Sequence, residues 1–160
     1  LSLATTIKYV DYCEEAWLLL RLRNYAASFA EREGNSKYYF IDPGILGLFL
    51  IDKEAMQLEN LVALHFFRSY GHDPDNERVF FYNDKYEVDF YIPDEELAIQ
   101  VSYSLRDEET RKREVEALRK LPKRLSCKRR IIVTFDEEEN ITDSFGTIEV
   151  IPAWKLLIEL

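Results

Sequence analysis

Two neighbouring segments near the middle of the chain alternate between apolar and polar residues. They cover residues 86–92 (YEVDFYI) and 97–102 (LAIQVS), and the four residues between them are enough for a hairpin turn. Period two is typical of strands with one buried face. The pattern therefore predicts two antiparallel strands. On the first strand it places Tyr86, Val88, Phe90 and Ile92 on one face and Glu87, Asp89 and Tyr91 on the other.

The short loop also fixes a register, if the residues that flank it pair with each other. Asp89 then lies opposite Gln100, and Glu87 lies opposite Ser102. Cross-strand neighbours have Cβ atoms about 5 Å apart. We therefore expect two acids, an amide and a hydroxyl to cluster on one patch of the sheet. A solvated outer face is the simpler explanation of the same pattern.

The rest of the chain shows the periods of short helices and strands. The expected helices are 3–17, 45–50, 54–70, 107–121 and 153–159; the expected strands are 18–25, 37–41, 79–82, 130–135 and 147–151, with an acidic turn over 136–140. From residue 54 this order predicts an α/β fold, a mixed sheet flanked by helices. Residues 1–50 have the element order of a partial winged helix, although a segment this short could also be a cover packed on the main core. We expect a boundary between segments 1–50 and 51–160.

Composition narrows the class of protein. The 160 residues are 47% hydrophobic and 14% aromatic, enough for one domain with a sizeable core. No apolar run approaches the ~20 residues of a membrane span, so we expect no membrane partner. Two cysteines, far apart in the chain, favour a reduced, cytoplasmic protein. The chain begins at Leu1 without a Met, so we expect a fragment, and the sequence leaves oligomerisation open.

Charge is distributed unevenly. The net charge of −9 argues against a general nucleic-acid binder, yet residues 106–130 alone carry +6. A solvated helix face explains such a run, and a phosphate-contacting face is the alternative. The candidate DNA-binding residues are Arg111, Lys112, Arg119, Lys120, Lys123 and Arg124.

The element order after residue 54 resembles the restriction-endonuclease-like fold of the PD-(D/E)xK nuclease superfamily. That resemblance implies a Glu on the first core helix, an Asp on the second strand and Glu-x-Lys on the third. Glu59 and Asp89 match the first two positions. Gln100 and Ser102 stand where the Glu and the Lys belong, so the motif is degenerate.

Five further motifs resemble, in this order, the C-terminal region of archaeal-type ATPases of the AAA superfamily. They are YFIDPG at 39–44, LENLV at 58–62, EVDF at 87–90, IQVSY at 99–103 and IPAW at 151–154. In that family a P-loop ATPase module precedes a winged helix and a nuclease-like domain of unknown function. No Gly-x-x-x-x-Gly-Lys-Ser/Thr occurs here, so ATP would act only through an absent N-terminal module.

The resemblance implies metal-dependent phosphodiester chemistry, in which carboxylates hold a divalent cation. Glu59 and Asp89 are the candidate ligands for a weakly held Mg²⁺. Gln100 is a poorer ligand and Ser102 has no charge, while Glu87 is the candidate substitute acid. For Glu59 the alternative is an ordinary ion pair, and for Asp89 a satisfied polar residue at the sheet edge.

Three hypotheses follow. The chain is a metal-dependent DNA endonuclease with a substituted active site, or a non-cleaving nuclease-like module that binds DNA or a partner protein. The third is a structural or regulatory appendage of the ATPase. The lost charges at Gln100 and Ser102 favour the second hypothesis, as does the basic segment 106–130.

Overall fold

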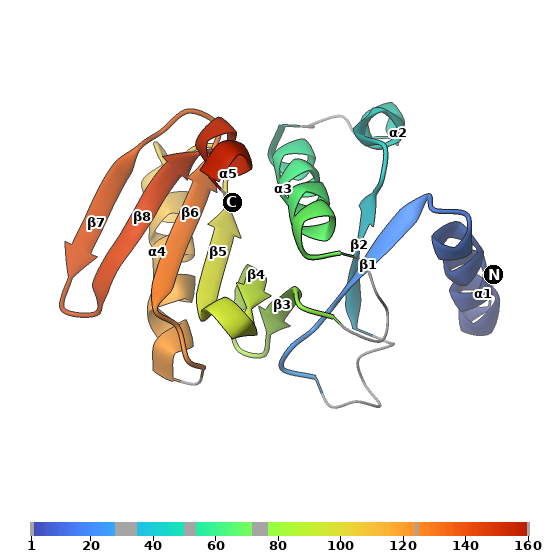
Figure 1. The fold of residues 1–160 in the computed structure, drawn as a ribbon, viewed down its shortest axis with the longest axis horizontal. Helices are drawn as coiled ribbons and strands as arrows, with labels where there is room; N and C mark the ends of the chain where they lie inside the picture. The colour runs from blue at the N-terminus through green and yellow to red at the C-terminus, as the bar shows by residue number, and fades with distance from the viewer. Residues whose placement is uncertain (1, 28–34, 50–53, 72–76, 124, 160) are drawn as a thin grey trace.

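A six-stranded mixed sheet forms the centre of the protein (Figure 1). The computed structural model describes residues 2–27, 35–49, 54–71, 77–123 and 125–159. The strands are β3 (Phe80–Asn83), β4 (Glu87–Ile92), β5 (Leu97–Val101), β6 (Arg129–Thr134), β7 (Glu139–Asp143) and β8 (Gly146–Pro152). Their order is β3-β4-β5-β6-β8-β7; β5, β6 and β8 are parallel, and the other neighbours are antiparallel. The predicted mixed sheet is confirmed.

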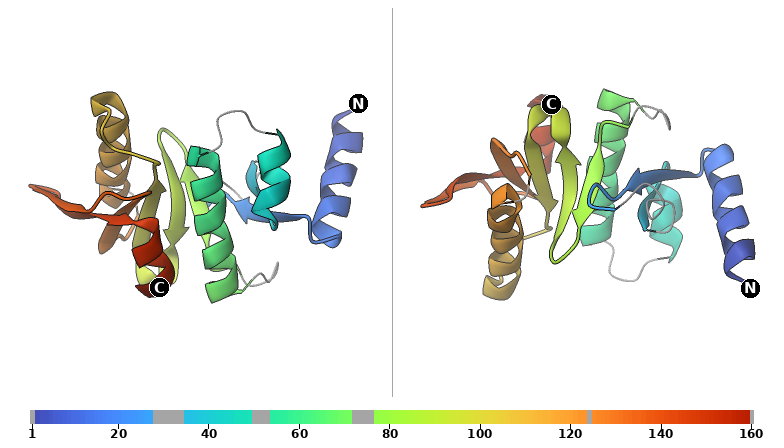
Figure 2. Two further views of the ribbon diagram at one scale, coloured as in Figure 1. Left: turned by 90° about the horizontal axis from the view of Figure 1, so that it is seen from above. Right: turned by 90° about the horizontal axis from the view of Figure 1, so that it is seen from below.

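Helices cover both faces of this sheet (Figure 2). Helix α4 (Glu108–Lys120) lies on one face with the short turn η2 (Leu121–Lys123), while α3 (Glu54–Tyr70) and α5 (Ala153–Glu159) lie on the other. A further short turn, η1 (Pro93–Glu95), joins β4 to β5. Helix α4 is capped as expected, since the Asp107 carboxylate accepts a hydrogen bond from the Thr110 N–H at 2.8 Å. The flanking helices, too, are as predicted.

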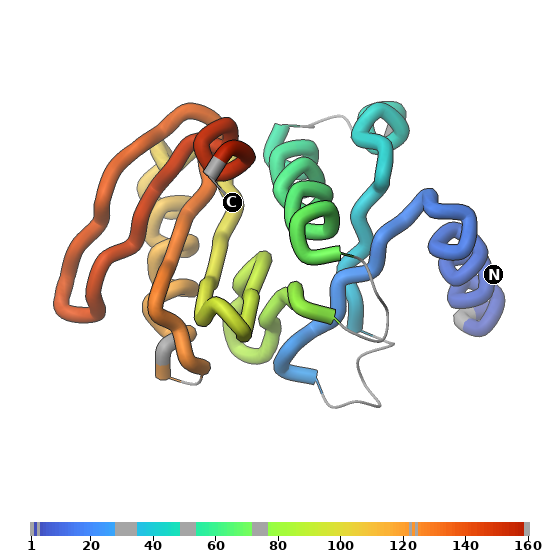
Figure 3. Tube along the Cα trace, in the orientation of Figure 1, coloured from blue at the N-terminus to red at the C-terminus, as the bar shows by residue number. Residues whose placement is uncertain are grey.

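The N-terminal elements extend away from the sheet (Figure 3). They are α1 (Leu3–Glu15), β1 (Leu19–Arg23), β2 (Ser36–Phe40) and α2 (Pro43–Phe49). Strands β1 and β2 form an antiparallel hairpin, which we call the N-terminal hairpin. Its Leu22 and Tyr39 share one core with Leu58 and Phe66 of α3. The partial winged helix and the boundary at residue 50 stay predictions, and residues 50–53 lie outside the described residues.

The alternation predicted for β4 is wrong at its centre. Phe80 pairs with Tyr91, and Tyr82 pairs with Val88, so two residues of β4 lie opposite one residue of β3. The extra residue is a β-bulge, which reverses the facing of the strand. Val88 and Tyr91 therefore share the core beneath α4, and Phe90 lies in the core beneath α3.

The acidic turn predicted over 136–140 is also partly wrong. Glu139 and Asn140 begin the edge strand β7, which pairs antiparallel with β8. Its positions alternate between half-buried and exposed, and Ile141 is its only apolar residue. A single apolar residue is too weak a signal for a strand, and charged residues are common on sheet edges.

Candidate functional site

The bulge in β4 positions Asp89 where the β4–β5 ladder ends. The predicted register is correct as far as the pair Phe90–Ile99. Beyond it the backbones of Asp89 and Gln100 do not pair directly, which corrects the prediction. Instead the Gln100 Oε1 accepts from the Asp89 N–H at 2.7 Å, and the Asp89 Oδ2 accepts from the Val101 N–H at 2.9 Å. Side chains thus replace the ladder at this point, and the Asp89 carboxylate is held in place.

Three carboxylates meet at the ammonium group of Lys37 on β2. The Lys37 Nζ lies 3.1 Å from Glu59 Oε1, 2.6 Å from Glu87 Oε1 and 2.9 Å from Asp89 Oδ1. We call Glu59, Glu87 and Asp89 the carboxylate cluster. As predicted, Glu59 and Asp89 lie at one patch. No sequence pattern pointed to Lys37, because tertiary packing alone brings its hairpin to the site.

Two side chains fix the N-terminal hairpin against α3. The Tyr39 hydroxyl donates to the Glu59 Oε1 at 2.7 Å. The buried Asn60 amide accepts from the Phe40 N–H at 2.8 Å and donates to the Phe40 carbonyl oxygen at 2.9 Å. The Asn60 side chain therefore satisfies the Phe40 backbone in the way that a neighbouring strand would. These contacts place Lys37 over the cluster.

On the other side of Asp89, the Gln100 amide is turned toward α4. Its Nε2 donates to the Glu114 Oε2 at 2.5 Å, and both side chains are about 95% buried. Arg113 pairs with the second oxygen of Glu114 at 2.6 Å. Sequence reasoning missed Glu114, a buried acid inside a strongly charged helix. Gln100 is thus held as an amide between a backbone donor and a carboxylate acceptor.

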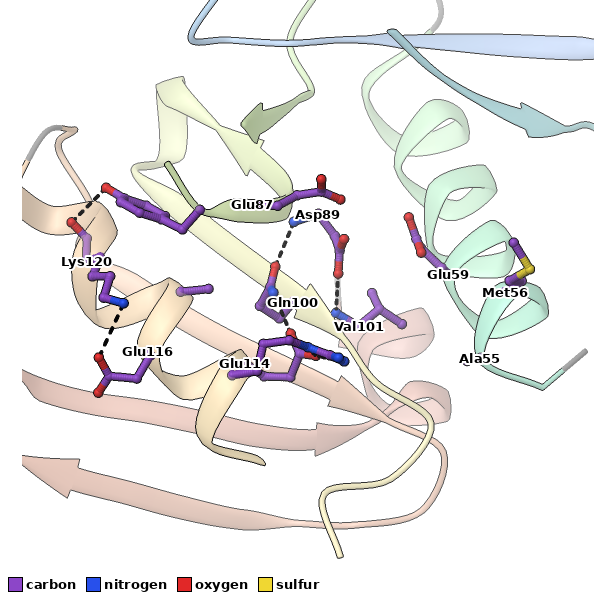
Figure 4. A pocket seen from close by; sticks show the side chains of 13 residues that line it. Ala55, Met56, Glu59, Glu87, Asp89, Gln100, Val101, Glu114, Glu116 and Lys120 are labelled. Carbon is purple, nitrogen blue, oxygen red and sulfur yellow. Dashed lines mark hydrogen bonds and ion pairs between the residues drawn. The ribbon is translucent and has the colours of Figure 1, made fainter. Parts of the chain in front are cut away.

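A pocket of about 530 Å³ opens between α3 and α4 (Figure 4). Its polar lining includes Glu59, Glu87, Asp89, Gln100 and Glu114, and Met56 and Ala117 are among its apolar residues. The side chains of the carboxylate cluster therefore reach solvent on the side where this pocket lies. A concave pocket with a few convergent polar groups is the usual form of a binding site.

Burial and charge together shift the titration of the site. Burial raises the pKa of Asp89 to about 6, against the attraction of the Lys37 ammonium. Burial alone would lower the pKa of Lys37, but Asp89, Glu59 and Glu87 overcome it and hold that pKa above its ordinary value. Burial, with the nearby Glu59 charge, raises the pKa of the Tyr39 hydroxyl. At neutral pH the site therefore contains a charged lysine and a neutral tyrosine.

Ser102 does not take part in this site. Its hydroxyl donates to the Ser104 carbonyl oxygen at 3.1 Å, and its N–H donates to the Val133 carbonyl oxygen at 2.9 Å. It does not line the pocket, and the ladder ends before Glu87 and Ser102 could face each other. The predicted Glu87–Ser102 neighbourhood is therefore wrong, and the bulge in β4 is the reason.

Three of the six predicted DNA-binding residues already form ion pairs with acids. Arg111 pairs with Glu139, and Arg119 pairs with Glu116 and Asp143. Lys120 lies 3.7 Å from Glu116, and the Lys123 ammonium lies 5.7 Å from the centre of the Phe145 ring. Lys112 is exposed and has no ion pair with another described residue, and Arg124 lies outside the described residues. Acids of β7 and of α4 itself thus neutralise much of the basic segment.

The residues present do not fit a bound Mg²⁺ as they stand. The Lys37 ammonium lies between the carboxylates that would hold the ion. Among the described residues, no group of three His, Cys, Asp or Glu side chains is arranged to hold a metal.

Comparison with known proteins identifies no relative. No family model, curated protein or solved structure matches the chain. Within the described part of the chain, no helix has both the length and the apolar character needed to cross a membrane.

Proposed function

We propose that this chain is a nuclease-like module of a P-loop ATPase that has lost cleavage and acts by binding a partner protein or DNA. The order of its elements supports a restriction-endonuclease-like fold, since a helix with Glu59 precedes a three-stranded meander and a helical crossover. The convergence of Glu59 and Asp89 supports the same assignment. The motifs at 39–44 and 151–154 support membership of an ATPase of the archaeal type.

The main support for a loss of cleavage is the position of Lys37. Its ammonium neutralises the carboxylates that would otherwise attract a divalent cation. Gln100 contributes an amide to the site rather than a carboxylate. Removing one preorganised charged group typically costs about 10²–10³ in rate, and the site departs from the motif at both Gln100 and Ser102.

The paired state of the basic segment favours a protein partner over DNA. Arg111 and Arg119 must leave Glu139 and Asp143 before they can contact phosphates. Aromatic residues, by contrast, stand exposed at the carboxyl ends of β5 and β6. Tyr103 stacks on the half-exposed Phe135 with ring centres 5.0 Å apart. Exposed aromatic side chains are typical of protein interfaces, and the chain's own ATPase module is the nearest candidate partner.

A cleavage assay tests the central claim. Supercoiled plasmid is incubated with the protein and Mg²⁺ or Mn²⁺, alongside Asp89→Ala. We expect no nicking above background from either protein. Nicking by the wild type that Asp89→Ala abolishes would refute the proposal.

A metal-dependent endonuclease with a substituted site is the second candidate. One observation favours it: Lys37 brings a cation to 2.9 Å from Asp89, and so supplies the charge that Ser102 lacks. The same plasmid assay with Lys37→Met separates the two functions. An endonuclease of this kind would lose activity in that variant, whereas a binding module has none to lose.

A further inference from the structure

The contacts of Lys37 resemble those of a bound cation more than those of a surface lysine. Its side chain is 22% exposed, and its three carboxylate partners come from α3 and β4. An ammonium group has three donors and no acceptor. Each donor is matched by an oxygen of a different carboxylate, so Lys37 is fully satisfied at this position.

The carboxylates are oriented by other groups as well. The second oxygen of Asp89 accepts from the Val101 N–H, and the second oxygen of Glu87 accepts from the Asn83 amide at 2.8 Å. The Tyr39 hydroxyl holds Glu59. These outer contacts fix ligands around a metal in the same way. The arrangement is therefore a shell of carboxylate oxygens with an ammonium group at its centre.

We propose that Lys37 is the resident cation of this shell and replaces the metal ion, so that the site is closed while the N-terminal hairpin is docked. A carboxylate-bound Mg²⁺ needs oxygen atoms about 2.1 Å away, in the space that Lys37 Nζ now fills. Two cations so close together would repel each other strongly in this partly buried site. Metal and Lys37 therefore exclude each other.

The hairpin and the site are coupled through this contact. Lys37 and Tyr39 both reach the cluster from β2, and Asn60 holds the same strand. Withdrawal of the hairpin would leave three carboxylates without a counter-ion, and this would be costly for Asp89, the one that is buried. A divalent cation would then supply the positive charge that the hairpin had provided.

Metal binding to the whole chain tests this inference. The free Mn²⁺ concentration is followed by electron paramagnetic resonance during titration of wild type, Lys37→Met and Lys37→Met/Asp89→Asn. Lys85→Met is the matched control, because it removes the same charge from an exposed position two residues before Glu87. We expect Lys37→Met to bind one Mn²⁺ about tenfold or more tighter than wild type, the size typical of changes beside metal ligands. Lys85→Met should match wild type, and Asp89→Asn should remove the gain.

Two results would overturn the inference. The first is a Lys37→Met variant that binds Mn²⁺ no tighter than wild type, and the second is a wild type that already binds one ion as tightly as the variant. Circular dichroism shows whether the Lys37→Met variant is folded. If Lys37→Met is unfolded alone, refolding on addition of Mn²⁺ supports the inference, and failure to refold at saturating Mn²⁺ contradicts it.

The inference rests on the proposed nuclease-like site, but its failure can be recognised separately. The titrations contain no nucleic acid, so unchanged Mn²⁺ affinity in Lys37→Met overturns the inference and leaves the proposed function intact. Failure of the proposed function appears instead as plasmid nicking by the wild type.

Discussion

The contact between Gln100 and Glu114 predicts that a carboxylate in place of the Gln100 amide will destabilise the protein. In Gln100→Glu, the 2.5 Å hydrogen bond becomes a contact between two carboxylates that are each about 95% buried. The lost bond to a charged acceptor costs about 2 kcal/mol. Leaving a buried charge unpaired costs about 3–5 kcal/mol. Since these costs overlap, we expect Gln100→Glu to lower the free energy of unfolding by about 4 kcal/mol at pH 8.

The loss should depend on pH, because a shared proton relieves the repulsion. The pair then has a folded-state pKa above that of the unfolded chain. The shared proton is present in full below the unfolded-state pKa, so the variant keeps its stability there. That stability is lost as the pH rises through the folded-state pKa. Gln100→Glu should therefore be nearer to wild type at pH 5 than at pH 8. Urea denaturation at both values measures the difference.

A reciprocal substitution is the sharpest control. Gln100→Glu with Glu114→Gln restores one amide donor and one carboxylate acceptor in swapped positions. We expect this double variant to regain most of the loss at pH 8. The Arg113–Glu114 ion pair is lost as well, but Arg113 is 72% exposed and contributes little. An unchanged urea midpoint for Gln100→Glu, or no recovery in the double variant, would refute the reasoning.

Three further outcomes follow from other parts of the site. Asn60→Ala should lower stability by about 2 kcal/mol in urea denaturation, because it removes both hydrogen bonds to the Phe40 backbone; a midpoint equal to wild type would contradict this. Burial raises the pKa of Asp89 to about 6, so its contribution to stability is complete below pH 3.8 and is lost as the pH rises through 6. Asp89→Asn should flatten the stability profile between pH 4 and 6, and an equally steep profile would count against the shift. Wild type should bind DNA weakly at low salt by fluorescence anisotropy, and Glu139→Gln, which frees Arg111, should strengthen that binding and its salt dependence; unchanged binding would exclude Arg111 as a phosphate contact.

Periodicity was sufficient to predict most helices and strands because their apolar residues repeat strongly. Helix α3 was predicted with its observed bounds, and so was α5. Strand β7 was missed because Ile141 is its only apolar residue. The faces of β4 were wrong for a different reason. A bulge is set by pairing with β3, and the sequence of β4 alone contains no sign of it.

The candidate site was predictable only in part, for a similar reason. Glu59 and Asp89 could be placed together because they match two positions of the nuclease motif that the chain resembles. Lys37 comes from a hairpin whose docking depends on Tyr39 and Asn60. Such long-range packing leaves no periodic trace in the sequence. The same limitation hid Glu114, whose burial depends on how α4 lies on the sheet.

The two departures from the nuclease motif are matched by two contacts in the structure. Gln100 needs an acceptor for its amide, and the buried Glu114 provides one. The missing cation at Ser102 has a counterpart in Lys37, which reaches Asp89 from another element. A buried polar network of this kind is stable only when every member is satisfied. A carboxylate at position 100 alone would therefore lie against the buried Glu114 without an amide to donate to it. The site is therefore better understood as a closed network than as an active site with two residues missing.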